Sequence, residues 1–88
     1  MNGRETPYEL AQTGITFLKS AVYNLLRENK IDSGLTNAEL GRALGIYGGH
    51  VRHEGHISRT ILSIMESEGV VAQDKESKRW KLKEIEIE

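Results

Sequence analysis

The stretch ILSIMESEGVVAQDKESKRWKL, residues 61–82, constrains the fold of this chain more than any other. Apolar residues at helical spacing are followed by a glycine, which is typical of a helix end, and then by two runs of strand-forming residues. In the second run Trp80 and Leu82 alternate with basic residues, so one face would pack inward and the other would be basic. The sequence therefore predicts a helix over residues 57–68 and a β-hairpin over residues 70–83 with its turn at KES.

Two capping boxes indicate where helices begin upstream of this stretch. Thr6 precedes Glu9 by three residues, and Thr36 precedes Glu39 in the same way. After Thr6, apolar residues recur at helical spacing to about Asn29, which predicts either one long helix or a short helix followed by a longer one. After Thr36, a short apolar pattern ends at a glycine, which predicts a short second helix.

The predicted second and third helices are separated by a glycine-rich stretch, YGGHVRHEG at residues 47–55, which predicts a loop. In the third helix we expect the apolar residues to share one face and the polar residues to lie on the other, because residues three or four apart lie on one side of a helix. The apolar stripe consists of Ile57, Ile61, Leu62, Ile64 and Met65, and the polar side includes Arg59, Ser63 and Glu66.

Length and composition limit the kind of protein that this chain can be. Its 88 residues are enough for one domain with a single modest hydrophobic core. The absence of cysteine excludes disulfide bonds and cysteine-ligated zinc. We expect no signal peptide and no membrane span, because the sequence has neither a leader-like apolar region nor a long apolar run. A cytoplasmic location is therefore expected.

Positive charge is concentrated in one part of the chain, although the net charge is only −1. Residues 42–83 carry eight basic and five acidic side chains, whereas residues 1–41 carry four and five. Three glutamates in the terminal EIEIE make residues 84–88 acidic. Because a protein meets a polyanion with one face rather than with its average charge, this distribution favours nucleic acid as a partner.

The order of these predicted elements resembles the winged helix-turn-helix family of DNA-binding proteins. The resemblance covers residues 15–83, and TNAELGRALGI and SRTILSIMESEGVVAQDKESKRWKL carry it. It implies a mainly α fold of the α+β class, with three helices and a C-terminal β-hairpin, called the wing. Residues 1–14 would be an N-terminal helical extension and residues 84–88 an acidic tail. The loop between the second and third helices is longer than the tight turn common in this family.

The resemblance implies sequence-specific binding of double-stranded DNA and a role as a small transcriptional regulator. The third helix would enter the major groove, and the wing would contact the phosphate backbone. Arg59 is the first candidate for a base contact, because a guanidinium can bond to guanine through two hydrogen bonds. The predicted DNA-binding residues are His56, Ser58, Arg59, Thr60 and Ser63 on the helix, Arg42, Arg52 and His53 beside it, and Lys75, Lys78, Arg79 and Lys81 on the wing.

Other interpretations of the same residues remain open. A winged-helix module that binds a protein partner without DNA is the main alternative, and the small net charge favours it. The wing lysines would then protect an edge strand from unwanted pairing. His50, His53 and His56, spaced three apart, raise the question of a zinc site, but no known zinc motif has this spacing. No catalytic motif is present, so we expect neither enzymatic activity nor a cofactor. Leu10, Ala11 and Ile15 near the N-terminus would either bury against a second copy or fold back on their own domain, and we expect the homodimer.

Overall fold

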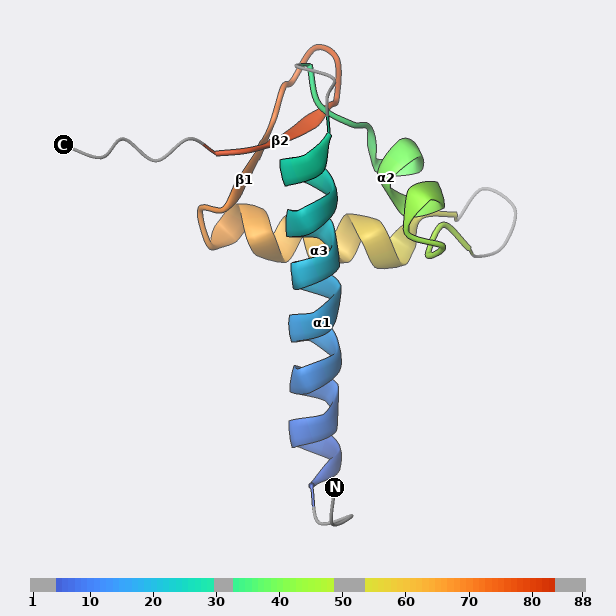
Figure 1. Ribbon diagram of the computed structural model, residues 1–88, viewed down its shortest axis with the longest axis vertical. Helices are drawn as coiled ribbons and strands as arrows, with labels where there is room; N and C mark the ends of the chain where they lie inside the picture. Colours follow the sequence, from blue (N-terminus) through green and yellow to red (C-terminus); the bar gives the residue numbers. More distant parts are fainter. Residues whose placement is uncertain (1–4, 30–32, 49–53, 84–88) are drawn as a thin grey trace, which may run out of the picture.

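The computed structural model describes residues 5–29, 33–48 and 54–83 and folds them into three α-helices and one antiparallel β-hairpin (Figure 1). The predicted mainly α fold of the α+β class, with the hairpin last in the chain, is confirmed. The elements are α1 (Pro7–Glu28), α2 (Asn37–Ala43), α3 (His56–Ser67), β1 (Val71–Gln73) and β2 (Trp80–Leu82).

The first helix, α1, is a single helix of 22 residues, which decides between the two predicted alternatives. Residues 7–14 are therefore the first turns of this helix, not a separate element. The predicted capping boxes are confirmed at both helix starts. The Thr6 hydroxyl accepts the backbone N–H of Glu9 at 3.1 Å, and the Glu9 carboxylate accepts that of Thr6 at 2.9 Å. Thr36 and Glu39 repeat these contacts at the same two distances.

The hydrophobic core lies where the C-terminal half of α1 crosses α3, with α2 and the hairpin closing its sides (Figure 1). The N-terminal half of α1 projects beyond this core. Every helix and strand contributes at least one buried side chain, so the core joins all five elements. Its buried members are Val22, Leu26, Leu40, Ile61, Leu62, Met65, Val71 and Trp80.

The hairpin pairs Val71 with Leu82 and Gln73 with Trp80. Trp80 is buried and Lys81 is exposed, as the alternation along this strand predicted. Leu35, just before α2, extends the pairing on the other edge of β2. Its N–H donates to the Trp80 carbonyl at 3.0 Å, and the Trp80 N–H donates to its carbonyl at 2.7 Å. β2 is therefore hydrogen-bonded along both edges, to β1 and to Leu35, and the pairing with Leu35 was not expected from the sequence.

The face that α3 buries matches the predicted apolar stripe at Ile61, Leu62 and Met65 but differs from it in the first turn. Ile57, predicted to be in the core, is 50% exposed, whereas Ser58 is fully buried. The reason is the close approach of α2: a side chain at Gly41 would place its Cβ 2.9 Å from the Ser58 hydroxyl oxygen. Only a small residue fits against Gly41 there. The side chain of Ser58 therefore points inward, and that of the preceding residue, Ile57, points outward.

None of the helices in the described part of the chain is long and apolar enough to cross a membrane.

Candidate nucleic-acid interface

The first turn of α3 is fixed to α2 by hydrogen bonds to one carbonyl group. The carbonyl of Gly55 accepts from the Asn37 side-chain amide at 3.3 Å, from the Ser58 hydroxyl at 3.2 Å and from the Arg59 N–H at 2.9 Å. Gly55 has a left-handed φ of 81°, and a Cβ there would lie 2.7 Å from the Tyr47 ring. Glycine adopts this left-handed backbone without strain and leaves room for the Tyr47 ring. This junction sets the direction in which α3 leaves α2.

The outward face of α3 carries most of the polar residues predicted for it. His56, Thr60 and Ser63 are exposed and follow one another at intervals of four and three residues along the helix. Arg59 is exposed beside this line, and its guanidinium donates to the Glu54 carbonyl at 3.4 Å. Ser58 points into the protein, so the prediction that it contacts DNA is wrong: its hydroxyl is buried and bonded to Gly55.

Arg42 lies beside the start of α3 and is held there by an aromatic ring. Its guanidinium carbon stands 4.7 Å from the centre of the Tyr47 ring, a cation–π geometry. Tyr47 itself packs closely against Gly41 and Gly55, since a Cβ at either glycine would collide with it. Arg42 is exposed, as its predicted role requires. The predicted contacts Arg52 and His53 lie outside the described residues, as does His50 of the suggested zinc site.

The turn of the hairpin is built around Asp74. Its carboxylate accepts the N–H of Ser77 at 2.7 Å, and its carbonyl accepts the N–H of Lys78 at 2.8 Å. The hydrogen bonds from Ser77 favour the charged carboxylate and hold the pKa of Asp74 below its ordinary value. Lys78 takes a left-handed φ of 64° at the end of the turn. Lys75, Lys78 and Lys81 are all exposed.

Arg79 differs from the other basic residues of the hairpin. Its guanidinium donates to the Glu39 carboxylate at 3.0 Å and to the Gly34 carbonyl at 2.8 Å, so it joins the hairpin to α2. Its side chain is only 28% exposed. Arg79 therefore makes an internal contact, in which the carboxylate on α2 offsets its charge, and its contact with DNA stays a prediction.

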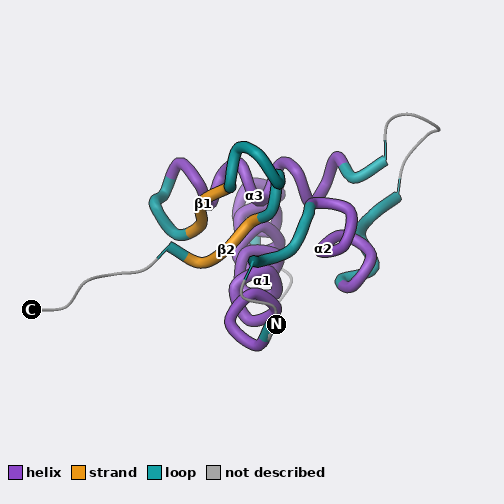
Figure 2. The backbone as a smooth tube through the Cα atoms, turned by 90° about the horizontal axis from the view of Figure 1, so that it is seen from above, coloured by secondary structure: helices purple, strands orange, loops and turns teal. Residues whose placement is uncertain are grey.

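Exposed cations lie on α2, on α3 and on the hairpin, and Figure 2 shows how these elements are arranged. Seen from above, α3 and the loop that joins β1 to β2 reach the upper edge of the view, whereas α1 extends toward its lower edge (Figure 2). The exposed cations of these parts are Arg42 of α2, Arg59 of α3 and Lys75, Lys78 and Lys81 of the hairpin. We call these five residues the basic surface.

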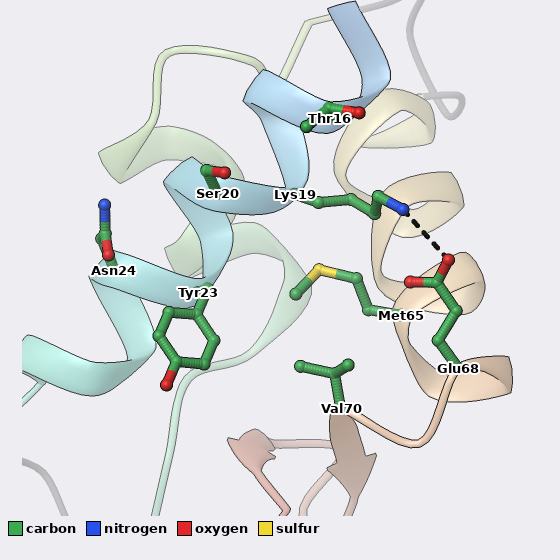
Figure 3. Close-up of a pocket in the computed structure, with 8 residues that line it drawn as sticks. All are labelled: Thr16, Lys19, Ser20, Tyr23, Asn24, Met65, Glu68 and Val70. Carbon is green, nitrogen blue, oxygen red and sulfur yellow. Dashed lines mark hydrogen bonds and ion pairs between the residues drawn. The ribbon is translucent and has the colours of Figure 1, made fainter. Parts of the chain in front are cut away.

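A groove of about 340 Å³ lies elsewhere, between α1, the end of α3 and Val70 (Figure 3). Met65 and Val70 form its apolar floor, and the Lys19 ammonium lies 3.0 Å from the Glu68 carboxylate at its rim. Among the residues that line the groove, only these two are charged, and they neutralise each other. The groove therefore has no net positive charge that would attract a phosphate. Its ion pair instead ties the last turn of α3 to α1.

Comparisons with protein-family models, with curated proteins and with solved structures found no match for this chain. The positions of two residues near Arg59 and Arg42 were not predicted from the sequence. Ile57 was assigned to the core but lies exposed next to Thr60. Tyr47, which was placed in a loop, orients Arg42. An aromatic residue close in sequence to an arginine and between two glycines was the available signal for Tyr47.

Proposed function

We propose that the protein binds double-stranded DNA with sequence specificity, in the manner of a winged helix-turn-helix domain, and acts as a small transcriptional regulator in the cytoplasm. The observation that carries the proposal is the basic surface: cations of α2, α3 and the hairpin are exposed, and α3 and the loop between the two strands reach the same edge of the molecule in Figure 2. A duplex presents closely spaced phosphates, so a surface of this kind gains affinity from each cation that reaches one.

In this proposal α3 reads the bases. A helix fits the major groove, and residues near its N-terminal end meet the base edges. Arg59 would bond to guanine, and Thr60 and Ser63 would bond to neighbouring base edges or phosphates. Ile57 adds an apolar contact suited to the methyl group of thymine. Glu66 repels phosphate, so only the first two turns of α3 would enter the groove.

The hairpin would contact the backbone beside the groove. Lys75, Lys78 and Lys81 form none of the ion pairs found among the described residues, although Lys81 lies near enough to Asp74 to help lower its pKa. Each lysine would neutralise one phosphate. Arg79 serves a different purpose in this arrangement: by bonding to Glu39 it keeps the hairpin at a fixed position relative to α2. Affinity would thus come from the lysines and geometry from Arg79.

Selection of bound duplexes from a random pool, followed by titration of the selected sequence at several salt concentrations, tests the proposal. We expect enrichment of a common sequence and an affinity that falls steeply as salt rises, because cations released from DNA oppose binding at high salt. Failure to bind any duplex at low salt would exclude the proposal. Binding with a salt dependence but without an enriched sequence would limit the function to nonspecific DNA association.

Two further points belong to this proposal. A homodimer through the N-terminal half of α1 would present two copies of α3 to a two-fold symmetric site. The alternative function is a winged-helix module that binds a protein partner, and two exposed residues of α3, the apolar Ile57 and the acidic Glu66, favour it. A partner protein that binds the wild type and an Arg59→Ala, Lys78→Ala double variant equally well would support this alternative.

A further inference from the structure

The projecting half of α1 exposes an apolar surface that residues 5–29, 33–48 and 54–83 leave uncovered. All side chains of residues 7–14 are exposed, and farther along the helix Phe17 is 71% exposed. Leu10 is 49% exposed. Glu9 is the one charged residue between positions 6 and 18, and it is engaged in the capping box. An exposed helix face with large apolar side chains and no charge is typical of an interaction surface.

Four residues of α1 form a seam on one face of the helix: Leu10, Gly14, Phe17 and Ala21. Their intervals of four, three and four residues keep them on the same side. Large and small side chains alternate along the seam. Among the described residues nothing requires glycine at position 14, because a Cβ there would meet none of them within 4 Å. Since glycine is unfavourable inside a helix, its presence suits close approach by another chain.

We infer that this seam binds a second copy of itself in the antiparallel direction. The intervals read the same in both directions, so all four positions of one helix face all four of the other. Leu10 then meets Ala21 of the partner subunit, and Phe17 meets Gly14 of the partner subunit. Each large side chain is thus placed against a small one. A parallel pair would instead set Phe17 against its own copy and leave space between the glycines.

The size of the seam sets the strength of this dimer. Each Phe17 side chain contributes roughly 150–250 Å² of surface, and each Leu10 contributes less. The total lies below the about 1,200 Å² at which stable specific interfaces begin. We therefore expect a dissociation constant on the order of micromolar. The protein would be monomeric when dilute and dimeric when concentrated or when held on a two-fold DNA site.

This inference deepens the proposed function, since it names the partner and the surface of the homodimer, but it is tested without DNA. If DNA binding fails while the dimer forms as described, only the function is lost. If the protein binds DNA but stays monomeric at high concentration, only the dimer is lost.

Sedimentation equilibrium of the full chain over a range of protein concentrations is the first test. Phe17→Ala should weaken self-association about tenfold or more, since each dimer loses two aromatic contacts. Tyr8→Ala is the matched control: Tyr8 is 73% exposed in the same half of α1 but lies on another face of the helix. A wild-type protein that remains monomeric at hundreds of micromolar, or a Tyr8→Ala variant weakened as much as Phe17→Ala, would overturn the seam.

A size exchange tests the register. Gly14→Leu should weaken the dimer by about tenfold because it fills the space that receives Phe17. It should leave the monomer folded, as nothing surrounds Gly14 there. The double variant Gly14→Leu, Phe17→Ala restores a large residue opposite a small one, and we expect it to dimerise more tightly than either single variant. Losses that simply add in the double variant would contradict the register.

The direction of the pair is tested by crosslinking, which the absence of native cysteine makes clean. A Leu10→Cys variant mixed with an Ala21→Cys variant should form a disulfide-linked heterodimer under mild oxidation. Leu10→Cys alone should crosslink poorly, because the two copies of position 10 lie at opposite ends of the seam. Efficient crosslinking of Leu10→Cys alone would show a parallel pair and overturn the inference.

Discussion

The guanidinium of Arg79 lies 3.0 Å from the carboxylate of Glu39, so that one contact joins the β-hairpin to the first turn of α2. The same carboxylate accepts the Thr36 N–H and closes the capping box of that helix. The hydrogen bond from Thr36, with a smaller effect of Arg79, keeps the pKa of Glu39 below its ordinary value. The start of a helix and the position of the hairpin therefore depend on a single charged group.

Replacement of Arg79 by alanine should lower the free energy of unfolding by about 1 kcal/mol, the usual value for a partly exposed, charged hydrogen-bond pair. Urea denaturation followed by circular dichroism measures the change. Lys78→Ala is the control, because Lys78 is a basic residue one position earlier with an exposed side chain. Equal stability of the two variants would show that the contact with Glu39 adds nothing to folding.

Arg59 and Lys78 should affect DNA binding in different ways. Arg59→Ala should reduce the preference for the selected sequence by about 1–3 kcal/mol at one base pair, since a bidentate contact to guanine is lost. Lys78→Ala should weaken binding to every duplex alike and reduce the slope of log affinity against log salt by about one. Fluorescence anisotropy with the selected and a scrambled duplex separates the two effects. If both variants weakened both duplexes equally, Arg59 would not read a base.

Gly55 and Gly45 allow backbone strain to be separated from crowding. Both have a left-handed φ, 81° and 74°, but a Cβ at Gly55 would strike Tyr47 and Asn37, whereas one at Gly45 meets nothing within 4 Å. Gly45→Ala should therefore cost about 1–2 kcal/mol from backbone strain alone. Gly55→Ala should cost about 1–3 kcal/mol more, since the crowded junction must also shift. Equal losses in the two denaturation curves would mean that the junction yields freely.

Acid should destabilise the protein by protonating three carboxylates that accept hydrogen bonds, two in the capping boxes and one in the hairpin turn. The pKa values of Glu9, Glu39 and Asp74 are lowered, chiefly by hydrogen bonds from Thr6, Thr36 and Ser77. A lowered pKa in the folded state gives stability that is fully present above the unfolded value and is lost as the pH falls through the folded value. The ordinary values are 4.5 for glutamate and 3.8 for aspartate, so the loss begins near these values and continues below them.

Thermal unfolding between about pH 6 and pH 3 measures this loss. Glu9→Gln should reduce the dependence on pH, because glutamine can complete the capping box without titrating. Glu66→Gln, which lies outside both capping boxes, is the control and should preserve the dependence on pH. A Glu9→Gln protein with the same acid sensitivity as the wild type would show that the first capping box has no part in it.

Local features of the chain were predictable from its sequence, and contacts between distant segments were not. The capping residues Thr6 and Thr36 act within four residues of themselves, so their sequence pattern was sufficient. The inward rotation of Ser58 depends on Gly41 in another helix, which no periodicity within α3 reveals. In the same way, alternation placed Arg79 outside the core, but its pairing with Glu39, 40 residues away, required the folded chain.

The unbroken course of α1 has a consequence for any assembly built on it. Its 22 residues form a rod about 33 Å long with no internal hinge. In a dimer, a pair of such rods would fix both the distance between the two domains at its ends and their relative rotation. Insertion of about five base pairs, half a helical turn, between two half-sites would then move one of them to the opposite side of the duplex. A rigid dimer could not bind both half-sites in that arrangement.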